Sequence, residues 1–351
     1  MHVIRVRNVQ EALPTALRSL DQVGIDRESR NGPVRLFPGP VTTVYEEPRE
    51  RVIYYPERDA NPFFHLFESL WMLAGRNDVK YVAHFVKRMK TFSDDGKTLH
   101  GAYGARWLKW FQQQTPDGEG FMLQDQLLNV IEALKANPDD RRQVISMWDG
   151  HVDPPTARAG GKDVPCNTHI YVSVGVDGRL DMTLCNRSND VVWGAYGANA
   201  VHFSYLQEFL AAGVGVPVGR LYQMSNNLHA YHATLEGVQA LTTQEPYNPY
   251  TEGLVEPYPL VSTNVKQWRE DLSVFLDVGP TPGLRDPFFR RVAIPMWLAH
   301  EAYKQSDELS RFDLAFQNLS NCHAADWRLA AQEWLERRQT AQAKREEEAD
   351  A

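Results

Sequence analysis

The stretch LCNRSNDVVWGAYGANAVHF, residues 184–203, decides the fold, because it joins the end of a strand, a loop and the start of a helix. Two segments with alternating apolar residues lead into it, HIYVSVGV at 169–176 and RLDMTLC at 179–185. The dipeptide Asp177-Gly178 links them, and this pair between alternating segments is the strongest short-range signal for a hairpin. We therefore predict two antiparallel strands that lead into the loop.

Three further motifs lie near this stretch: DRRQVISMW at 140–148, VPCNTH at 164–169 and NNLHAYH at 226–232. Each is weak alone, but their order and spacing together resemble thymidylate synthase, and resemble even more the phage deoxycytidylate hydroxymethylases of the same superfamily. The resemblance covers roughly residues 29–232. It implies an α/β (α+β) fold in which a mixed sheet packs against helices and one sheet face forms a homodimer interface.

Helices are predicted on both sides of these motifs. The first covers PFFHLFESLWML, residues 62–73, where large apolar residues are interrupted by few polar ones. The second covers LQDQLLNVIEALKANP, residues 123–138, whose leucines recur on one face. A third extends from about Asn199 to Ala212 and ends at Gly213.

The remaining segments are predicted to be less regular. Residues 1–60 mix short apolar runs with turn residues, which indicates strands and hairpins. Proline and glycine crowd residues 244–285, which we interpret as a loop region. We assign residues 1–323 to one catalytic domain and residues 324–351 to a C-terminal helical extension with a frayed, charged end.

The composition excludes several classes of protein. The net charge of −8 over 351 residues argues against a protein that grips duplex nucleic acid. Three cysteines cannot form a disulfide framework, and their odd number leaves a free thiol. The first residues lack the apolar core of a signal peptide, and no long apolar run follows. We expect no membrane partner and a cytoplasmic location, in the host cytoplasm if the protein is phage-encoded.

Cys166, in VPCNTH, is the predicted nucleophile. In the family that the sequence resembles, the nucleophile precedes the Arg-Ser pair of a phosphate-binding loop, as Cys166 precedes Arg187 and Ser188 here. The alternative is a buried structural thiol, the commoner role of an isolated cysteine. A phosphate site rich in arginine would lower the pKa of the thiol and favour the thiolate, which is the attacking form. Cys185 and Cys322 have no such surroundings and are interpreted as structural.

A nucleotide phosphate needs several charge-assisted donors, and each guanidinium group offers two parallel N–H groups to its oxygens. The resemblance gives this role to Arg187 and Ser188, and it makes Arg30, in ESRNG, a flexible arginine that closes over the phosphate. Arg141 and Arg142 resemble the pair that the family lends across its dimer interface, so that each active site uses two chains. By composition alone, the same two arginines belong to a solvated loop after NPDD.

Asn199 is at the position that reads the base in the family. An amide can donate to the oxygen at carbon 4 and accept from the N3 hydrogen of uracil, whereas the aspartate expected in deoxycytidylate hydroxymethylases suits cytosine. The spacing between Gly194 and Asn199 is one residue longer than in the family pattern. The alternative role of Asn199 is to cap the helix that follows it. His229 and Tyr231 resemble the pair that binds the 3′ hydroxyl of the sugar.

Three more residues complete the implied catalytic site. Glu68 lies in an otherwise apolar helix and resembles the glutamate that orders water and relays protons to the base. Tyr103, in GAYGARW, matches the tyrosine near the carbon 5 proton. Asp190 matches the aspartate that meets the pterin of 5,10-methylenetetrahydrofolate, the expected cofactor. The alternative is that Tyr103 is an ordinary core tyrosine and Asp190 an ordinary turn aspartate. No metal site is expected.

The resemblance implies a one-carbon transferase in which Cys166 adds to carbon 6 of a pyrimidine nucleotide and activates carbon 5. Three features favour a final step in which water, rather than hydride, adds to the one-carbon group at carbon 5. They are the string RSNDVV, the presence of Asn167 after the predicted nucleophile where the family usually has histidine, and the lack of the family's short closing tail. We therefore predict hydroxymethylation of dUMP, as phages use to make modified DNA bases. Thymidylate synthase, a dCMP or CMP hydroxymethylase, and a noncatalytic nucleotide- or RNA-binding protein are the alternatives.

Overall fold

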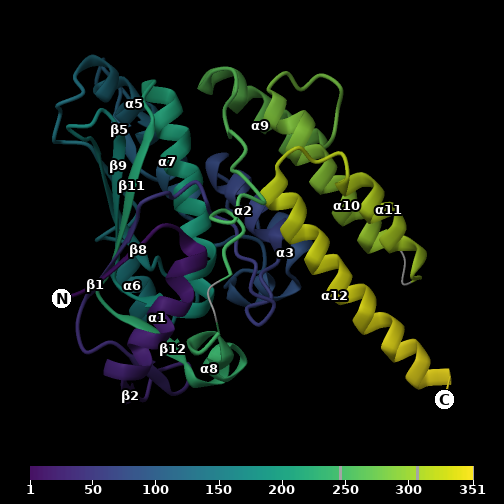
Figure 1. Cartoon of the computed structure of the whole chain (residues 1–351). Helices are drawn as coiled ribbons and strands as arrows, with labels where there is room; N and C mark the ends of the chain where they lie inside the picture. The colour runs from purple at the N-terminus through teal and green to yellow at the C-terminus, as the bar shows by residue number, and fades with distance from the viewer. Residues whose placement is uncertain (245–246, 306–307, 351) are drawn as a thin grey trace.

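The computed structural model describes residues 1–244, 247–305 and 308–350 (Figure 1). Its centre is a six-stranded sheet with the strand order β1-β4-β11-β9-β8-β7. The pairs β1–β4 and β11–β9 are parallel and the other pairs are antiparallel, so the predicted mixed sheet is confirmed. The strands are β1 (His2–Val6), β4 (Val41–Tyr45), β7 (Val144–Ser146), β8 (Asn167–Val174), β9 (Leu180–Asn186) and β11 (Val218–Ser225).

The predicted hairpin is formed by β8 and β9, which pair in antiparallel register. Gly178 in the connection has a φ of 74°, a left-handed conformation that glycine adopts without strain. A second sheet has the order β10-β12-β3-β2, and a separate hairpin pairs β5 with β6. These strands are β2 (Ile25–Arg27), β3 (Val34–Leu36), β5 (Gln112–Gln114), β6 (Phe121–Leu123), β10 (Asn189–Asp190) and β12 (Leu228–Tyr231).

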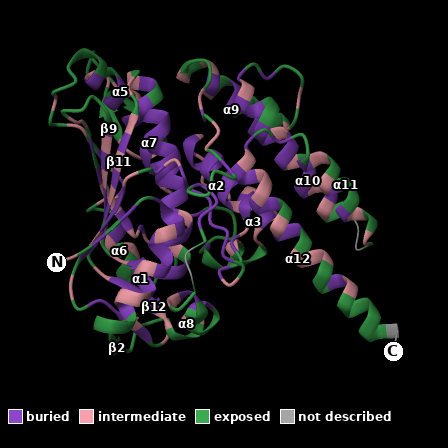
Figure 2. Ribbon diagram, viewed as in Figure 1, coloured by how far each residue is buried: buried purple, intermediate pink, exposed green. Residues whose placement is uncertain are grey.

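Helices cover one side of the six-stranded sheet (Figure 1). The central helix α7 contacts β9 and β11 on one side and α2 on the other, and nearly all its side chains are buried (Figure 2). The N-terminal and middle helical segments are α1 (Val9–Val23), α2 (Pro62–Leu73), α3 (Val79–Phe85), η1 (Lys87–Phe92), α4 (Tyr103–Ala105), η2 (Arg106–Trp110), α5 (Gln126–Ala136), α6 (Asp153–Arg158), η3 (Val191–Asn199) and α7 (Ala200–Val214).

The C-terminal helices pack against α2 and α3, on the side away from the sheet (Figure 1). The first half of α12 joins the same hydrophobic core through Trp327 and Trp334, and the Tyr250 hydroxyl donates to the buried Asp326 carboxylate at 3.1 Å. The far end of α12 projects from the body and is exposed (Figure 2). The helical segments after β12 are α8 (His232–Val238), η4 (Gln239–Thr242), α9 (Val265–Val278), η5 (Phe289–Ala293), α10 (Ile294–Gln305), α11 (Ser310–Leu319) and α12 (Ala325–Asp350). Of these, α8 contacts β12 and η4 contacts α1, apart from the C-terminal helices.

The prediction of strands and hairpins for residues 1–60 was wrong in one large part, because α1 occupies Val9–Val23. The helix is amphipathic and begins at Asn8, whose side chain accepts a hydrogen bond from the backbone N–H of Glu11. Pro14 lies inside the helix, past its first turn, where it removes one intrahelical hydrogen bond, and this proline hid the helical period. The predicted helix over residues 62–73 is confirmed as α2.

Three boundaries also differ from the predictions. Residue 123 ends strand β6 and the helix starts later, at Gln126, where Asp125 caps it. Helix α7 continues past Gly213, which packs against Ile131, and ends at Gly215 with a φ of 90°. The supposed loop region 244–285 contains α9, an amphipathic helix that buries Trp268 and other apolar residues; residues 245–246 lie outside the described residues.

The C-terminal segment forms a helix in the described residues, and its assignment to an extension with a frayed, charged end stays a prediction. Helix α12 is continuous to Asp350, and Ala351 lies outside the described residues. The polar residues of its last turns are exposed, so they are helical without contributing to the core.

Candidate active site

Cys166 lies immediately before β8, and Arg187 holds the segment that carries it. The backbone N–H of Arg187 donates to the Cys166 carbonyl at 2.8 Å. The Arg187 guanidinium donates from Nε to the Pro165 carbonyl at 2.8 Å and from Nη2 to the Val164 carbonyl at 3.0 Å. The predicted nucleophile and the predicted phosphate ligand are therefore joined directly, and Arg187 has a structural role as well.

Tyr103, at the start of α4, also meets the nucleophile segment. Its hydroxyl oxygen accepts hydrogen bonds from the backbone N–H groups of Cys166, at 3.2 Å, and Asn167, at 3.3 Å. Gly104 allows this approach, because an added Cβ there would lie 2.0 Å from the Met72 carbonyl oxygen of α2. The close packing of α4 on α2 thus places the phenol next to the backbone of Cys166 and Asn167.

The electrostatic environment of Cys166 differs from the prediction. Burial raises the pKa of the thiol above its ordinary value of 9.0, and Arg187 and Arg30 oppose this increase only in part. Asp163, three residues before the nucleophile, raises the pKa further. The pKa is raised rather than lowered as expected, because the effect of burial exceeds the opposing effect of the two arginines.

A cavity of about 450 Å³ gathers five of the predicted substrate ligands. Two of its pairs are fixed by hydrogen bonds: His229 Nδ1 lies 2.9 Å from Asn227 Oδ1, and Asn31 donates to the Tyr231 hydroxyl at 3.5 Å. The cavity also includes Arg27, Asn226 and Asn227, which the sequence had not singled out although the asparagines stand in the motif NNLHAYH. The predicted residues that line it are Arg30, Arg187, Ser188, His229 and Tyr231.

Arg141 and Arg142 are not part of this cavity. Both are exposed on the segment between α5 and β7, and Arg142 pairs with its neighbour Asp140 through Nε at 2.9 Å and Nη2 at 3.0 Å. The fold of one chain therefore leaves these two arginines outside the cavity. Their predicted role across a dimer interface stays a prediction.

Asn199 ends a π-helical segment, η3, that is interrupted by Tyr196 and Gly197 in non-helical conformations. A π-type turn holds one residue more than an α-helical turn. This geometry accommodates the additional residue between Gly194 and Asn199 and keeps Asn199 at the start of α7. The capping alternative is wrong, because the backbone of Asn199 is already helical and its side chain makes no cap hydrogen bond.

The Asn199 amide is buried between two other asparagines. Its Oδ1 accepts from Asn167 Nδ2 at 3.2 Å, and its Nδ2 donates to Asn189 Oδ1 at 3.0 Å. Each of these contacts uses one of the two lone pairs or one of the two N–H groups that an amide offers. These two contacts leave one N–H group and one lone pair of the Asn199 amide unused.

Asp190 lies beside His229, because β10 and β12 pair in parallel with these two residues in register. Asp190 Oδ1 accepts from the backbone N–H of Trp193 at 2.5 Å, whereas Oδ2 is buried and has no hydrogen-bond partner among the described residues. Burial raises the pKa of this carboxyl, and His229 and Arg58 oppose the increase. The site thus contains a withdrawn carboxyl oxygen that is ready to bind a ligand.

Arg58 is a residue of this region that the sequence did not suggest. Its guanidinium lies 4.2 Å from the ring centroid of Trp193, an indole that is 51% exposed, and its Nε donates to the Val192 carbonyl at 2.6 Å. Burial lowers the pKa of Arg58 to about 10. The guanidinium therefore holds the RSNDVVW segment in place from a position far away in the sequence.

Glu68 lies on α2, the helix that packs against both α7 and α4. Its Oε2 is 3.1 Å from Nε2 of the buried His202 on α7. The predicted glutamate thus lies between α4, which carries Tyr103, and α7, which follows Asn199. No contact of Glu68 with the Cys166 segment is found among the described residues.

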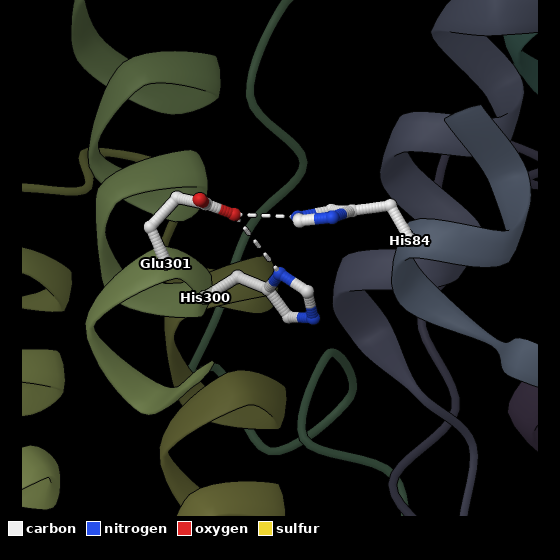
Figure 3. A group of neighbouring side chains, drawn as sticks. All are labelled: His84, His300 and Glu301. Carbon is white, nitrogen blue, oxygen red and sulfur yellow. Dashed lines mark hydrogen bonds and ion pairs between the residues drawn. The ribbon is translucent and has the colours of Figure 1, made fainter. Parts of the chain in front are cut away.

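His84, His300 and Glu301 form a cluster of metal-ligating side chain types between α3 and α10 (Figure 3). Glu301 Oε1 is 2.5 Å from His84 Nε2 and 3.8 Å from His300 Nδ1. Two ligands bound at about 2.0–2.1 Å to one tetrahedral ion lie farther apart than the first pair does. The contact between Glu301 and His84 is therefore a direct hydrogen bond that joins the two helices.

No helix in the described part of the chain is both long and apolar enough to cross a membrane.

Comparison of the sequence with known proteins identifies its relatives. The model of the family described as thymidylate synthase matches residues 63–258. A deoxyuridylate hydroxymethyltransferase of Pseudomonas phage M6 is 55% identical over 97% of this chain and 95% of the relative. A protein of the same name from Bacillus phage SP01 is 34% identical over 68% of this chain and 64% of the relative. Another, from Delftia phage PhiW-14, is 28% identical over 70% of this chain and 66% of the relative.

Proposed function

Because this chain belongs to the thymidylate synthase family, we propose that it is a deoxyuridylate hydroxymethyltransferase, which converts dUMP to 5-hydroxymethyl-dUMP. The predicted family resemblance and the one-carbon transferase class are confirmed by the match of the family model and by the phage relatives. The dUMP substrate is supported by the name of a relative that aligns with nearly the whole chain.

The observation that carries the proposal is the junction of a nucleophile with an anion pocket. Arg187 lines the cavity of about 450 Å³ and also binds the two carbonyls that precede Cys166. A phosphate held by Arg187, Ser188 and Arg30 would thereby be tied to the position of the thiol. A noncatalytic binding protein has no need for this link.

In the proposed reaction, the Cys166 thiolate adds to carbon 6 of the base, and carbon 5 becomes nucleophilic. The one-carbon unit that methylenetetrahydrofolate would supply becomes bonded to carbon 5, its bond to the folate nitrogen breaks, and tetrahydrofolate would leave. The Tyr103 hydroxyl, close to the nucleophile segment, and water ordered by Glu68 assist the loss of the carbon 5 proton. Water then adds to the methylene carbon attached at carbon 5, and the bond between the Cys166 sulfur and carbon 6 breaks. The net change at carbon 5 replaces one hydrogen by a hydroxymethyl group.

Methylenetetrahydrofolate would supply the one-carbon unit, and the residues present fit a bound pterin. Asp190 has a buried Oδ2 without a partner among the described residues, and its raised pKa lets the carboxyl keep a proton more readily. A carboxyl in either protonation state can bind ring nitrogen or amide groups. The exposed indole of Trp193 beside it offers a flat apolar surface.

We also propose a homodimer in which Arg141 and Arg142 complete the phosphate site of the partner. Both arginines are exposed and outside the cavity of their own chain. The sheet also presents exposed apolar side chains on β8, β11 and β7, which are Tyr171, Met224 and Val144. Apolar side chains on a sheet face are typical of a surface that another chain covers. Residues 1–323 would form the catalytic domain, with residues 324–351 as a supporting extension, and the host cytoplasm would be the site of action.

The proposal is tested by incubating the protein with methylenetetrahydrofolate and, separately, dUMP, dCMP, UMP and CMP, followed by mass spectrometry of the nucleotides. A hydroxymethyl product from dUMP alone is expected. A methyl product would show a thymidylate synthase instead, and a cytidine product would overturn the uracil assignment.

A covalent adduct provides the second readout. With 5-fluoro-dUMP and methylenetetrahydrofolate, the wild-type protein should form a complex that survives denaturation, and Cys166→Ser should not. Cys185→Ser is the matched control, because Cys185 is a buried thiol of β9 outside the cavity. Absence of both product and adduct from the wild-type protein would favour the noncatalytic alternative.

A further inference from the structure

We propose that His202 positions the Glu68 carboxylate for the proton step at carbon 5. His202 is thus a positioning residue, which acts through Glu68 rather than on the substrate. The inference rests on the proposed function, because Glu68 has a proton to relay only if Cys166 activates the base. His202 lies in the stretch that decides the fold, but no motif in the sequence singled it out.

The contact between the two side chains joins α2 to α7. Glu68 Oε2 lies 3.1 Å from His202 Nε2, and the two side chains are only 12% and 4% exposed. Within residues 1–244, 247–305 and 308–350, the Glu68 carboxylate has no hydrogen bond and no second ion pair. A carboxylate that is withdrawn from water is costly without a partner. His202 is therefore the side chain that can hold Glu68 in a defined orientation.

His65, the other histidine of α2 near this contact, does not compete for Glu68. Its ring centroid is 6.4 Å from that of His202, and the two rings meet edge to face. Burial holds the pKa of His65 well below its ordinary value of 6.5, and Arg58 and His202 lower it further. His65 is therefore neutral at physiological pH and offers Glu68 no positive charge.

The imidazole of His202 has a donor position that is not yet used. Nε2 is buried and is not in line with any hydrogen-bond acceptor in the part of the chain that the structure describes, so its approach to Glu68 is close but not aligned. Buried polar atoms without a partner are uncommon in folded proteins. Hydrogen bonds at catalytic sites are often poorly aligned until substrate binds. We therefore expect bound dUMP to turn one of the two side chains so that Nε2–H points at Oε2.

The first turn of α7 connects this pair to the rest of the site. Asn199 and His202 are three residues apart, a spacing that places two side chains on one face of a helix. The next residue, Phe203, packs against the ring of Tyr103 with the centroids 5.8 Å apart. One helical turn thus carries the proposed base-reading residue and contacts both the glutamate and the tyrosine of the proposed mechanism.

An aligned hydrogen bond would determine how Glu68 serves the reaction. With His202 donating to Oε2, the plane of the carboxylate is fixed and Oε1 is left to hold the water. The proton of carbon 5 passes to this water, and the water passes a proton to Oε1. Loss of His202 should therefore lower kcat. Binding of dUMP should change little, because His202 is not one of the residues that line the cavity of about 450 Å³.

The test measures kcat and KM for dUMP, the Kd of dUMP and the Tm for three variants of His202. His202→Ala and His202→Asn should each lower kcat by about thirtyfold with KM and Kd nearly unchanged. The amide of His202→Gln reaches the position of Nε2, which the shorter asparagine does not, so His202→Gln should keep kcat within about threefold of wild type. The matched control is Ser204→Ala on the same helix, which removes a buried hydroxyl that donates to the Val201 carbonyl and should leave kcat unchanged.

A double-mutant cycle separates this role from a structural one. In a Glu68→Gln background, His202→Ala should lower the residual kcat by no more than about twofold, because the carboxylate on which His202 acts is gone. A full thirtyfold loss in that background would overturn the proposal, since His202 would then act independently of Glu68. Equal kcat for the alanine, asparagine and glutamine variants, or an equal loss in Ser204→Ala, would overturn it as well.

A crystal structure of the wild-type protein with dUMP provides a readout that needs no turnover. We expect Nε2 of His202 to be aligned with Glu68 Oε2 in this complex. A Glu68 carboxylate turned to a different partner would overturn the proposal. Failure of the proposed function is recognised separately, as a methyl product or a cytidine product from the wild-type protein, and the variants of His202 are then compared on that reaction. Wild-type protein that turns over none of the nucleotides would overturn both.

Discussion

The Tyr103 hydroxyl oxygen lies 3.2 Å from the backbone nitrogen of Cys166 and accepts its N–H. It also accepts from the backbone N–H of Asn167 at 3.3 Å. With both lone pairs directed at the backbone, the phenolic O–H is left free to point toward a substrate. One side chain thus fixes the nucleophile segment and offers a proton donor next to it.

Tyr103→Phe should lower kcat for dUMP by about a hundredfold while dUMP still binds, because the phenolic O–H can hold the water that takes the carbon 5 proton. The adduct with 5-fluoro-dUMP should still form, since fluorine at carbon 5 removes that step. Tyr81→Phe is the control, as the Tyr81 hydroxyl is buried without a partner in the described part of the chain. Steady-state kinetics and adduct yield are the measurements; an adduct lost in parallel with turnover would assign Tyr103 a structural role only.

The reactivity of Cys166 should be low at neutral pH. Its pKa is raised by burial, so the thiolate fraction stays small until the pH exceeds the ordinary thiol value of 9.0. The rate of alkylation by iodoacetamide should therefore still be increasing above pH 9. Cys166→Ser identifies the modified residue, because Cys185 and Cys322 are buried. A rate that levels off below pH 8 would show that the arginines outweigh burial.

Much of the fold was open to prediction from local sequence patterns. The hairpin of β8 and β9 follows from Asp177-Gly178 between alternating segments, and α2 follows from its apolar composition. Helix α1 was missed because Pro14 stands inside it, and α9 was missed because loop residues surround it. Local signals fail where the decisive contacts are tertiary.

The candidate site shows the same limit. Motif order identified the residues around the cavity, because they lie near strand ends that the sheet register brings together. Arg58 could not be identified, since its contact with Trp193 depends on a buried guanidinium from a distant segment. Asn186 and Asn189 each resemble ordinary polar residues next to a turn, and only the fold brings them into hydrogen bonds with Asn167, Ser225 and Asn199.

If Arg141 and Arg142 act across a dimer, mixing two inactive variants so that their chains exchange should restore activity. The Arg141→Ala/Arg142→Ala protein keeps its nucleophile, and Cys166→Ser keeps both arginines. In a randomly mixed population, half of the dimers are mixed and each has one intact site, so about a quarter of the wild-type activity should return. Activity after mixing and light scattering for the oligomeric state are measured. No recovery from a confirmed dimer would place the arginines elsewhere.

Gly194→Ala should weaken dUMP binding by about tenfold and lower the Tm by a few degrees, because the added Cβ would meet Asn189 Oδ1 at 2.6 Å. Asn189 cannot move away easily, since both of its amide atoms are engaged. Gly237→Ala in α8 is the matched control, where a Cβ meets nothing within 4 Å. Isothermal calorimetry and thermal unfolding measure the two effects, and equal behaviour of both variants would contradict the prediction.

His300 should make the protein less stable in mild acid. Burial lowers its pKa from 6.5 to about 4, so between these values the unfolded chain binds the proton and the folded chain does not. Its contribution is fully present above pH 6.5 and decreases as the pH falls towards 4, by up to about 3 kcal/mol. The pKa of Glu301, lowered to about 2 beside the two histidines, changes stability only at lower pH, from 4.5 downwards.

The measurement is the free energy of unfolding in urea at pH 7 and pH 4.5 for the wild-type protein, His300→Gln and His151→Gln. Between these pH values the wild-type protein should lose about 2 kcal/mol more than His300→Gln, whose amide does not titrate. His151 is exposed, so its replacement should leave the wild-type difference unchanged. If His300→Gln and the wild-type protein lose the same amount, the buried imidazole is not the group that senses acid.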